Sequence, residues 1–312
     1  MLKTLALKVP RIKALASHRD ALLSERNALL TERDRLLDAL LSERDALLTE
    51  RDRLLEAQGA AIRRTDELLL ANSQLADALK HANGLPIPPR HLQERVAGGY
   101  FSDFLSSATH ALSDFDRSLK SAGKRLAEFD HVLDLGVGCG RVIRRFHELH
   151  PQASLTGADI DSEAIAWLRQ NYGSVGTFVT LPHFPPSELE AGAFDLVYAI
   201  SVFSHLNEEM QFAWLGELQR ITKAGAHLLL TVHGRKHQLM FPDDIQQRIV
   251  SRGFYYNEDS AVTDGLPSFY KSTIHTRDYV EREWSRFFEI LHYEEQGHAD
   301  YQDLILCRKR QG

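Results

Sequence analysis

The sequence predicts an α/β protein in which a mostly parallel sheet, covered by helices on both faces, follows a long N-terminal helix. Three observations predict this class. A leucine repeat runs over about residues 14–82. From about residue 91 onward, segments typical of strands and helices alternate. Two strand-like segments, FEILHYEE (288–295) and QDLILCRK (302–309), end the chain, and their short connection makes them antiparallel.

The leucine repeat predicts one helix over residues 14–83. The unit RNALLTERDRLLDALLSE begins at Arg26 and nearly recurs from Arg44. Eighteen residues make about five turns of an α-helix, so the leucine pairs stay on one face. A coiled coil through which the chain self-associates is the leading interpretation, although arginines fall at heptad positions where apolar side chains are expected. The alternative is a solitary charged helix held by pairs such as Glu32–Arg35.

The repeat divides the chain into four predicted parts. Residues 1–13 form a tail and residues 14–83 the helix. The linker GLPIPPR at 84–90 cannot continue a helix, because it contains three prolines. Residues 91–312 form a globular domain, which opens with an amphipathic helix near residues 104–119. Inside it, about 40 residues at 234–272 form an insertion, and connections of this length are commonly lids or binding loops.

The composition excludes several classes of partner and location. The formal net charge is −6, whereas a protein that grips many phosphates needs a basic face, so nucleic acid is excluded as a partner. No apolar run approaches the roughly 20 residues that span a bilayer. Basic residues interrupt residues 1–13, which excludes a signal peptide and leaves open a weak contact with a membrane surface. The two cysteines, Cys139 and Cys307, suit a reducing cytoplasm.

HVLDLGVGCGRVIRRFHELH (131–150) predicts a buried strand, a glycine turn and an amphipathic helix. Glycines permit unusual backbone angles and let a ligand lie against the bare main chain. The dinucleotide fingerprint needs a glycine at position 141, where this chain has Arg141. The pattern D-x-G-x-G-x-G resembles motif I of the class I methyltransferases that use S-adenosyl-L-methionine (SAM). The resemblance implies that the turn packs against the methionine portion of SAM.

This resemblance supplies most of the predicted cofactor site. In the family, the acidic residue before the turn helps to orient the amino group of SAM, directly or through the turn. ASLTGADID (153–161) predicts the second strand; its Asp159, 19 residues after Gly140, is placed to accept hydrogen bonds from both ribose hydroxyls. Ile160 would lie beside the adenine. FDLVYAISVFSHL (194–206) resembles motif IV, so Ser201 is a candidate contact of SAM. The complete predicted set is Asp134, Gly136, Gly138, Cys139, Gly140, Asp159, Ile160 and Ser201.

One segment departs from the family pattern. Many members place an acidic residue after the third strand to hold the adenine amino group, and GTFVTLPHFPPSEL (176–189) has none at the strand end. Backbone groups near Leu181 would have to serve instead. The C-terminal strand pair resembles the hairpin that closes the seven-stranded, Rossmann-like methyltransferase sheet, in which the last strand is antiparallel. The resemblance covers about residues 95–310.

The predicted function is methyl transfer from SAM to a hydroxyl of a sugar, a glycolipid or another small acceptor. A hydroxyl acceptor usually needs a base near neutral pH, and histidine is the commonest choice. His205 and His233 follow the fourth and fifth predicted strands, and His275 follows the insertion. No cluster at metal-ligand spacing appears, so no metal is expected. The alternatives are a protein or amine N-methyltransferase, and a coiled-coil scaffold whose methyltransferase-like domain only senses SAM.

Overall fold

The structure is a computed structural model and describes residues 2–97, 104–261 and 265–311. The chain divides into two compact units, residues 1–74 and residues 75–312. We describe each unit by itself. Within the described residues, no helix is both long enough and apolar enough to cross a membrane.

A single helix, α1 (Leu2–Asn83), contains the whole leucine repeat. It begins at Leu2, so the residues predicted as a tail belong to it. It ends at Asn83, as the sequence predicts, and the φ of +73° at Gly84 suits a left-handed helix cap. Along the described part of α1, the ion pairs join neighbouring residues such as Arg19 and Asp20 (2.6 Å) instead of the predicted residues three apart. The self-association of α1 stays a prediction.

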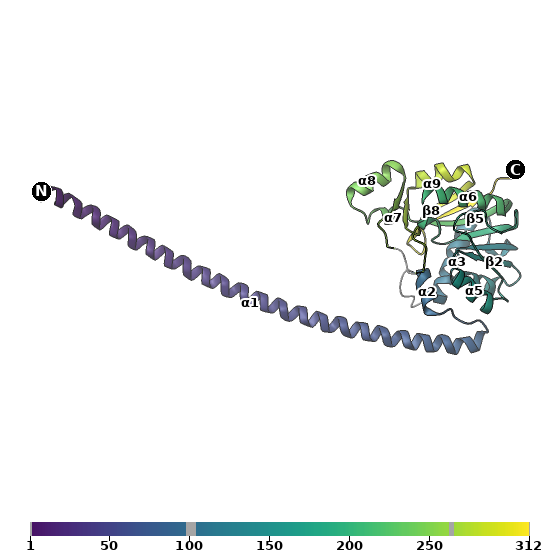
Figure 1. The fold of residues 1–312 in the computed structure, drawn as a ribbon, viewed down its shortest axis with the longest axis horizontal. Helices are drawn as coiled ribbons and strands as arrows, with labels where there is room; N and C mark the ends of the chain where they lie inside the picture. The colour runs from purple at the N-terminus through teal and green to yellow at the C-terminus, as the bar shows by residue number, and fades with distance from the viewer. Residues whose placement is uncertain (1, 98–103, 262–264, 312) are drawn as a thin grey trace. The chain divides into compact units, whose positions relative to one another are not determined.

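The globular unit contains the predicted seven-stranded sheet (Figure 1). Its strand order is β3-β2-β1-β4-β5-β9-β8. All neighbouring pairs up to β5 are parallel, while β9 runs antiparallel to both β5 and β8. The prediction of one antiparallel last strand is therefore confirmed. The strands are β1 (His131–Leu135), β2 (Ser154–Asp159), β3 (Thr177–Thr180), β4 (Phe194–Ala199), β5 (Thr222–Val232), β8 (Glu289–His298) and β9 (Gln302–Arg308).

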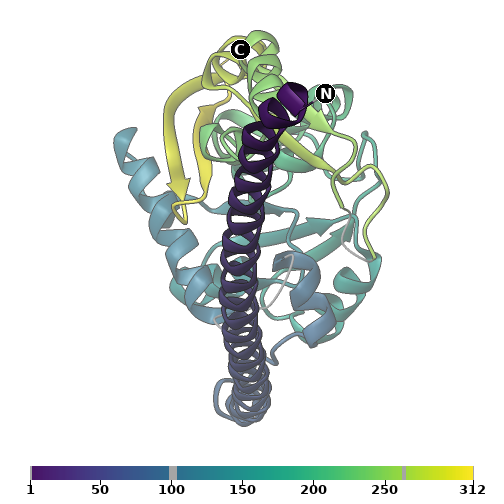
Figure 2. The same ribbon diagram turned by 90° about the vertical axis from the view of Figure 1, so that its left-hand side faces the viewer.

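Helices cover both faces of this sheet because its strands are apolar on both sides. Val132 packs with α3 (Phe104–Ser121), α4 (Arg141–Leu149) and α5 (Ser162–Asn171). Its neighbour Leu133 faces the other way, toward α6 (Glu208–Ile221) and α9 (Arg277–Glu283). Figure 2 shows α3 beside the β8–β9 edge. Short 3-10 helices complete the unit at Leu126–Glu128, Phe203–His205 and Trp284–Arg286.

Local capping rules explain where several helices begin. Asp161 accepts hydrogen bonds from the backbone N–H groups of Glu163 and Ala164 at the start of α5. Asn207 caps α6 in the same way, and Thr276 caps α9. Asp161, Asn207 and Thr276 are all of residue types that commonly cap helices. These capping residues help to fix the candidate site, because each of them lies next to a segment at the carboxyl ends of the strands.

The predicted linker is held against the globular unit. Arg144 donates to the backbone carbonyls of Leu85 (3.1 Å) and Pro86 (3.3 Å), and the Tyr172 hydroxyl donates to the Pro86 carbonyl (2.8 Å). A further helix, α2 (Arg90–Ala97), follows at once. The globular unit therefore needs residues 85–90, which the sequence assigned to a linker outside the domain.

The insertion has secondary structure of its own. It contains α7 (Arg235–Gln238), α8 (Asp243–Arg252) and β6 (Phe254–Asn257), and β6 pairs with β7 (Ser272–His275) in a separate two-stranded sheet. The backbone of β7 also touches the main sheet, because His275 N–H donates to the His233 carbonyl (2.8 Å). The insertion is thus fixed beside the end of β5.

Candidate active site

The glycine turn between β1 and α4 is built as the sequence predicts. Gly136, Gly138 and Gly140 have φ values of +79°, +52° and +85°, which L side chains rarely adopt. A Cβ atom on Gly138 would lie 2.5 Å from Cγ2 of Val96, and one on Gly136 would collide with Val202. Only a bare backbone fits at these two positions.

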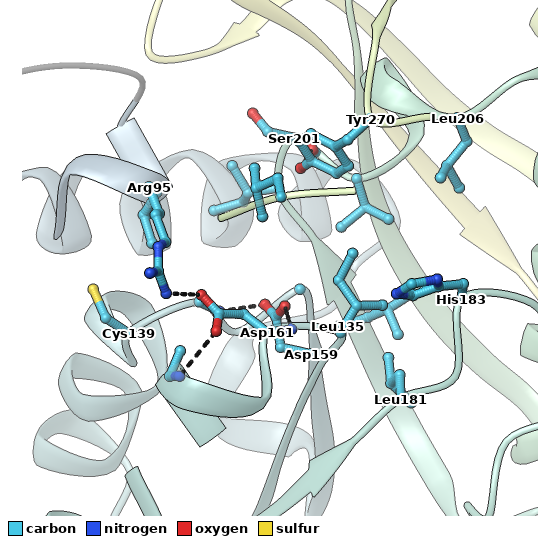
Figure 3. Close-up of a pocket in the computed structure, with 18 of the residues that line it drawn as sticks. Arg95, Leu135, Cys139, Asp159, Asp161, Leu181, His183, Ser201, Leu206 and Tyr270 are labelled. Carbon is cyan, nitrogen blue, oxygen red and sulfur yellow. Dashed lines mark hydrogen bonds and ion pairs between the residues drawn. The ribbon is translucent and has the colours of Figure 1, made fainter. Parts of the chain in front are cut away.

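Asp159 ties this turn to the end of β2. One carboxylate oxygen accepts the Gly138 N–H (2.7 Å), and the other accepts the Asp161 N–H (2.9 Å). Burial raises the pKa of Asp159, and these two backbone donors oppose the rise. Each oxygen keeps a further acceptor site, so the carboxylate can also bind a hydroxyl pair. Figure 3 shows it at the centre of a cavity.

The cavity lies at the carboxyl ends of β1, β2 and β4, where ligands of open α/β sheets bind. Its volume is about 110 Å³. Apolar residues dominate its wall, and a few polar groups face into it. Of the predicted cofactor residues, six line it: Gly136, Gly138, Cys139, Asp159, Ile160 and Ser201.

Residues 133–228, from β1 into β5, match the family model described as a methyltransferase domain. The chain carries a class I SAM-dependent methyltransferase domain, and its cofactor is SAM.

Comparison with solved structures gives distant similarities. Human N-acetylserotonin methyltransferase in complex with SAM is 18% identical over 65% of this chain and 52% of its own, with a TM-score of 0.45. A protein from Pyrococcus horikoshii OT3 is 18% identical over 66% of this chain and 91% of its own, with a TM-score of 0.48. This chain thus spans about half the length of the human enzyme. A search of curated proteins gave no match.

The residues of the methyltransferase cavity fit SAM. The glycine turn offers bare backbone, Asp159 offers two acceptors, and Leu135, Ile160 and Leu181 supply apolar surface. Ligands of this size usually occupy roughly 300–1,000 Å³. Because the cavity is smaller and Val96 fills the space over Gly138, we expect α2 to shift when SAM enters. When bound, SAM supplies an electrophilic methyl group on a sulfonium.

Two predicted cofactor residues lie outside the cavity lining. Asp134 is buried beneath the turn, and burial raises its pKa to about 7. Its carboxylate interacts with the Tyr198 hydroxyl and with the backbone N–H of Ile143 in the first turn of α4. A Cβ atom on Gly140 would lie 2.5 Å from Leu168 and 3.1 Å from Tyr172, so Gly140 permits close packing of α5. Cys139 does line the cavity, but burial raises the pKa of its thiol to about 12, which keeps it neutral.

The sequence did not identify the contribution of α2. Leu92, Arg95 and Val96 line the cavity. Arg95 donates to Asp161 (3.0 Å) and forms an ion pair with Glu163 (2.7 Å), as Figure 3 shows for Asp161. These carboxylates raise the pKa of Arg95. No local sequence pattern predicts this role, because Arg95 and Asp161 are 66 residues apart in the chain.

The insertion also reaches the cavity through Phe269 and Tyr270. The Tyr270 hydroxyl donates to the Ser201 carbonyl (2.8 Å), and Gln302 donates to the Ser201 hydroxyl (2.7 Å). Ser201 adopts a φ of +56°, an uncommon angle for a residue other than glycine. The two hydrogen bonds hold this strained corner at the end of β4. The aromatic composition of the insertion was the signal for Phe269 and Tyr270.

The structure does not bring the three predicted histidines to the cavity. His205 stacks on Tyr270 with ring centroids 4.2 Å apart and is not among the residues that line the cavity. His233 packs edge-on to His205 (5.6 Å) and face to face with His237 (4.0 Å). Burial lowers the pKa of His205 to about 4 and that of His233 to about 2. Both imidazoles are therefore neutral at pH 7.

The placement of His275 differs most clearly from the prediction that it serves as a base. Its side chain is fully buried, and Nε2 lies 2.9 Å from Oε1 of Gln211. The Gln211 amide nitrogen donates to two backbone carbonyls, so its oxygen accepts and His275 Nε2 carries the proton. His275 thus joins β7 to α6 inside the core. Burial lowers its pKa to about 3.

The wall beyond β3 holds two further residues. The Leu181 N–H, which the sequence offered for adenine, already donates to the Asp159 carbonyl (2.7 Å). His183 lines the cavity two residues later and packs edge-on to Phe269 (5.2 Å). Among the described residues, no group of three or more His, Cys, Asp or Glu side chains is arranged to hold a metal ion.

Proposed function

We propose that this enzyme transfers the methyl group of SAM to a hydroxyl of a sugar, a glycolipid or another small acceptor. One observation carries the proposal: Phe269 and Tyr270 of the insertion line the cavity next to Ser201 at the end of β4. Aromatic rings at this place can stack on the C–H face of a sugar ring. The excess of 43 acidic over 37 basic residues disfavours a nucleic-acid acceptor.

The cofactor roles follow from the cavity. Asp159 holds the ribose hydroxyls, and Gly136 and Gly138 let the methionine portion lie against the backbone. Ile160 packs on the adenine, while Asp134 acts through the turn. The remaining task is alignment of the acceptor oxygen with the sulfonium methyl and exclusion of water. Tyr270 contributes to both, since it covers the cavity and fixes Ser201.

His205 acts on this chemistry through Tyr270 as a positioning residue. Its imidazole stacks behind the tyrosine ring and is neutral at pH 7 because burial lowers its pKa to about 4. His233 supports His205 from the far side. His275 serves stability instead, because it bonds to Gln211 in the core.

The proposed place of action is the cytoplasm, with self-association through residues 14–83. Cys139 and Cys307 are both free and buried, which suits a reducing compartment. Along the described part of α1, leucines such as Leu29 and Leu47 are each 66% exposed, and pairing of two helices would cover them.

Product analysis tests the acceptor. The purified protein is incubated with SAM labelled in its methyl group and with the carbohydrate and glycolipid fractions of a cell extract. The label is then located by mass spectrometry and NMR. We expect a methyl ether on a carbohydrate carbon. A new methyl group on nitrogen contradicts the hydroxyl acceptor and leaves the methyltransferase assignment intact.

The variant His205→Ala tests the positioning role. Loss of the stacked ring should lower the thermal midpoint and reduce kcat by roughly tenfold or less, while the Kd for SAM stays within about twofold. General bases contribute about 10²–10⁴-fold to a rate. A loss of that size at an unchanged thermal midpoint contradicts the positioning role and makes His205 the base. The variant His205→Phe keeps a stacking ring and should restore most of the rate.

A further inference from the structure

A second cavity lies on the insertion. Its volume is about 600 Å³, which falls in the range of ligand-binding clefts. We call it the insertion groove. Its lining comes from the start of α6, from α8 and β6, and from the turn after β6: Asn207, Glu208, Glu209, Arg248, Arg252, Phe254, Tyr255, Tyr256, Glu258 and Asp259.

The groove and the SAM cavity lie next to each other at two separate places in the chain. Leu206 lines the SAM cavity, and the next residue, Asn207, lines the groove. Tyr256 lines the groove, and its hydroxyl donates to the carbonyl of Phe269 (2.7 Å), which lines the SAM cavity. The two cavities are therefore neighbours, and a chain of sugar residues that passes over these residues reaches both.

The groove offers the chemistry that recognises uncharged sugars. Four carboxylates, two guanidinium groups and one amide supply planar acceptors and donors that match neighbouring hydroxyls. Tyr255 and Tyr256 add aromatic surface. Apolar chains of a lipid find few partners on so polar a wall. The formal charge of the lining, four acids against two arginines, also disfavours phosphate.

Part of this polar set is free to bind a ligand. Glu208 accepts the Tyr279 hydroxyl (2.7 Å) and pairs with Arg252 (3.4 Å). Among the described residues, Glu258 and Asp259 have no ion-pair partner. The guanidinium of Arg248 lies over the ring of Tyr255 (5.7 Å). These groups gain hydrogen bonds when a sugar enters.

We infer that the insertion groove binds the part of an oligosaccharide acceptor that lies beyond the methylated residue. The inference rests on the proposed function and narrows its substrate class: the acceptor is a chain of two or more sugar residues. One residue occupies the SAM cavity beside Tyr270. The following residues pass over Asn207 and Tyr256 and bind in the groove.

The test compares acceptors of different length. The polysaccharide fraction of the source cells is partially hydrolysed with acid and separated into monosaccharides and longer fragments. The wild-type enzyme should methylate fragments of two or more residues with a kcat/KM at least tenfold higher than monosaccharides. Equal kcat/KM values for both overturn the groove inference and leave the carbohydrate acceptor standing. Absence of transfer to every carbohydrate fraction overturns the proposed acceptor itself.

A variant locates the effect in the groove. The double change Glu258→Gln and Asp259→Asn keeps the shape of the side chains and removes their charge. It should lower the ratio of oligosaccharide to monosaccharide kcat/KM at least tenfold, mainly through KM. The matched control is Glu188→Gln with Glu190→Gln, two exposed acids outside both cavities. A ratio that changes equally in both double variants, or in neither, contradicts the inference.

Discussion

The repeat helix and the catalytic unit use leucine in opposite ways. Leu36 in α1 is 56% exposed, whereas Leu133 in β1 is fully buried between the sheet and the helices α6 and α9. In α1 the period of the repeat alone sets the stripe of leucines. In the catalytic unit, partners far apart in sequence cover each side chain. A sequence pattern thus predicts which face of a helix or strand is apolar. Whether that face is buried depends on a second surface that packs against it.

Charged groups differ between the two regions in the same way. The Arg19–Asp20 pair of α1 has both side chains more than 60% exposed, and exposed pairs of this kind contribute little to stability. In the catalytic unit Asp134, Asp159 and several histidines are buried, and burial shifts their pKa values. Shifted pKa values cluster at functional sites. In this chain Asp159 lines the SAM cavity, whereas His275 lies in the core between β7 and α6.

The largest expected effect comes from replacing a buried histidine of the catalytic unit, and an exposed histidine of α1 provides the control. His275→Gln should flatten the pH dependence of the free energy of unfolding, while His18→Gln, an exposed change in α1, should not. The pKa of His275 is about 3 in the folded state and near 6.5 in the unfolded chain. Below pH 6.5 the unfolded state binds one more proton, so stability falls as the pH drops.

The size of this effect can be measured by chemical denaturation. One proton corresponds to about 1.4 kcal/mol per pH unit, or about 2 kcal/mol between pH 6.5 and 5. His275→Gln should remove that share of the slope. Above about pH 7.5, where the unfolded histidine has lost its proton, the two slopes should coincide. Identical slopes between pH 5 and 6.5 for the wild type and His275→Gln mean that His275 is protonated in the folded core.

The parts of the fold that the sequence predicted depend on local chemistry. Glycine backbone angles, helix caps such as Asp161, and the short connection before β9 act within a few residues. The placement of Arg95 over the cavity and of Tyr270 against Ser201 depends on packing between distant segments. No periodic pattern in the sequence predicts contacts between segments that are so far apart. The three histidines are a further example. The sequence predicted the strand ends that they follow, but it did not predict that their side chains pack away from the cavity lining.

A smaller effect is expected when the cofactor site changes. Asp159→Ala removes an acceptor for the ribose hydroxyls and should weaken SAM binding at least tenfold, or about 1.4 kcal/mol. Calorimetry on the folded variant measures it. The matched control is Asp300→Ala, an exposed acid away from the cavity. The same loss should appear with and without α1, because every residue that lines the cavity belongs to the unit 75–312. Unchanged affinity removes Asp159 from the ribose site.

The smallest effect on the SAM site should follow removal of α1 itself. A chain that begins at Gly84 keeps Leu85 and Pro86, whose carbonyls bind Arg144 and Tyr172. Its Kd for SAM should stay within about twofold of the full-length value.

Light scattering should find a dimer or trimer for the full chain and a monomer for the shortened one. The double change Leu29→Gln with Leu47→Gln should dissociate the full chain, and Ser42→Gln should not. A monomeric full-length protein at micromolar concentration favours the solitary helix, because exposed leucines on a paired helix would be covered.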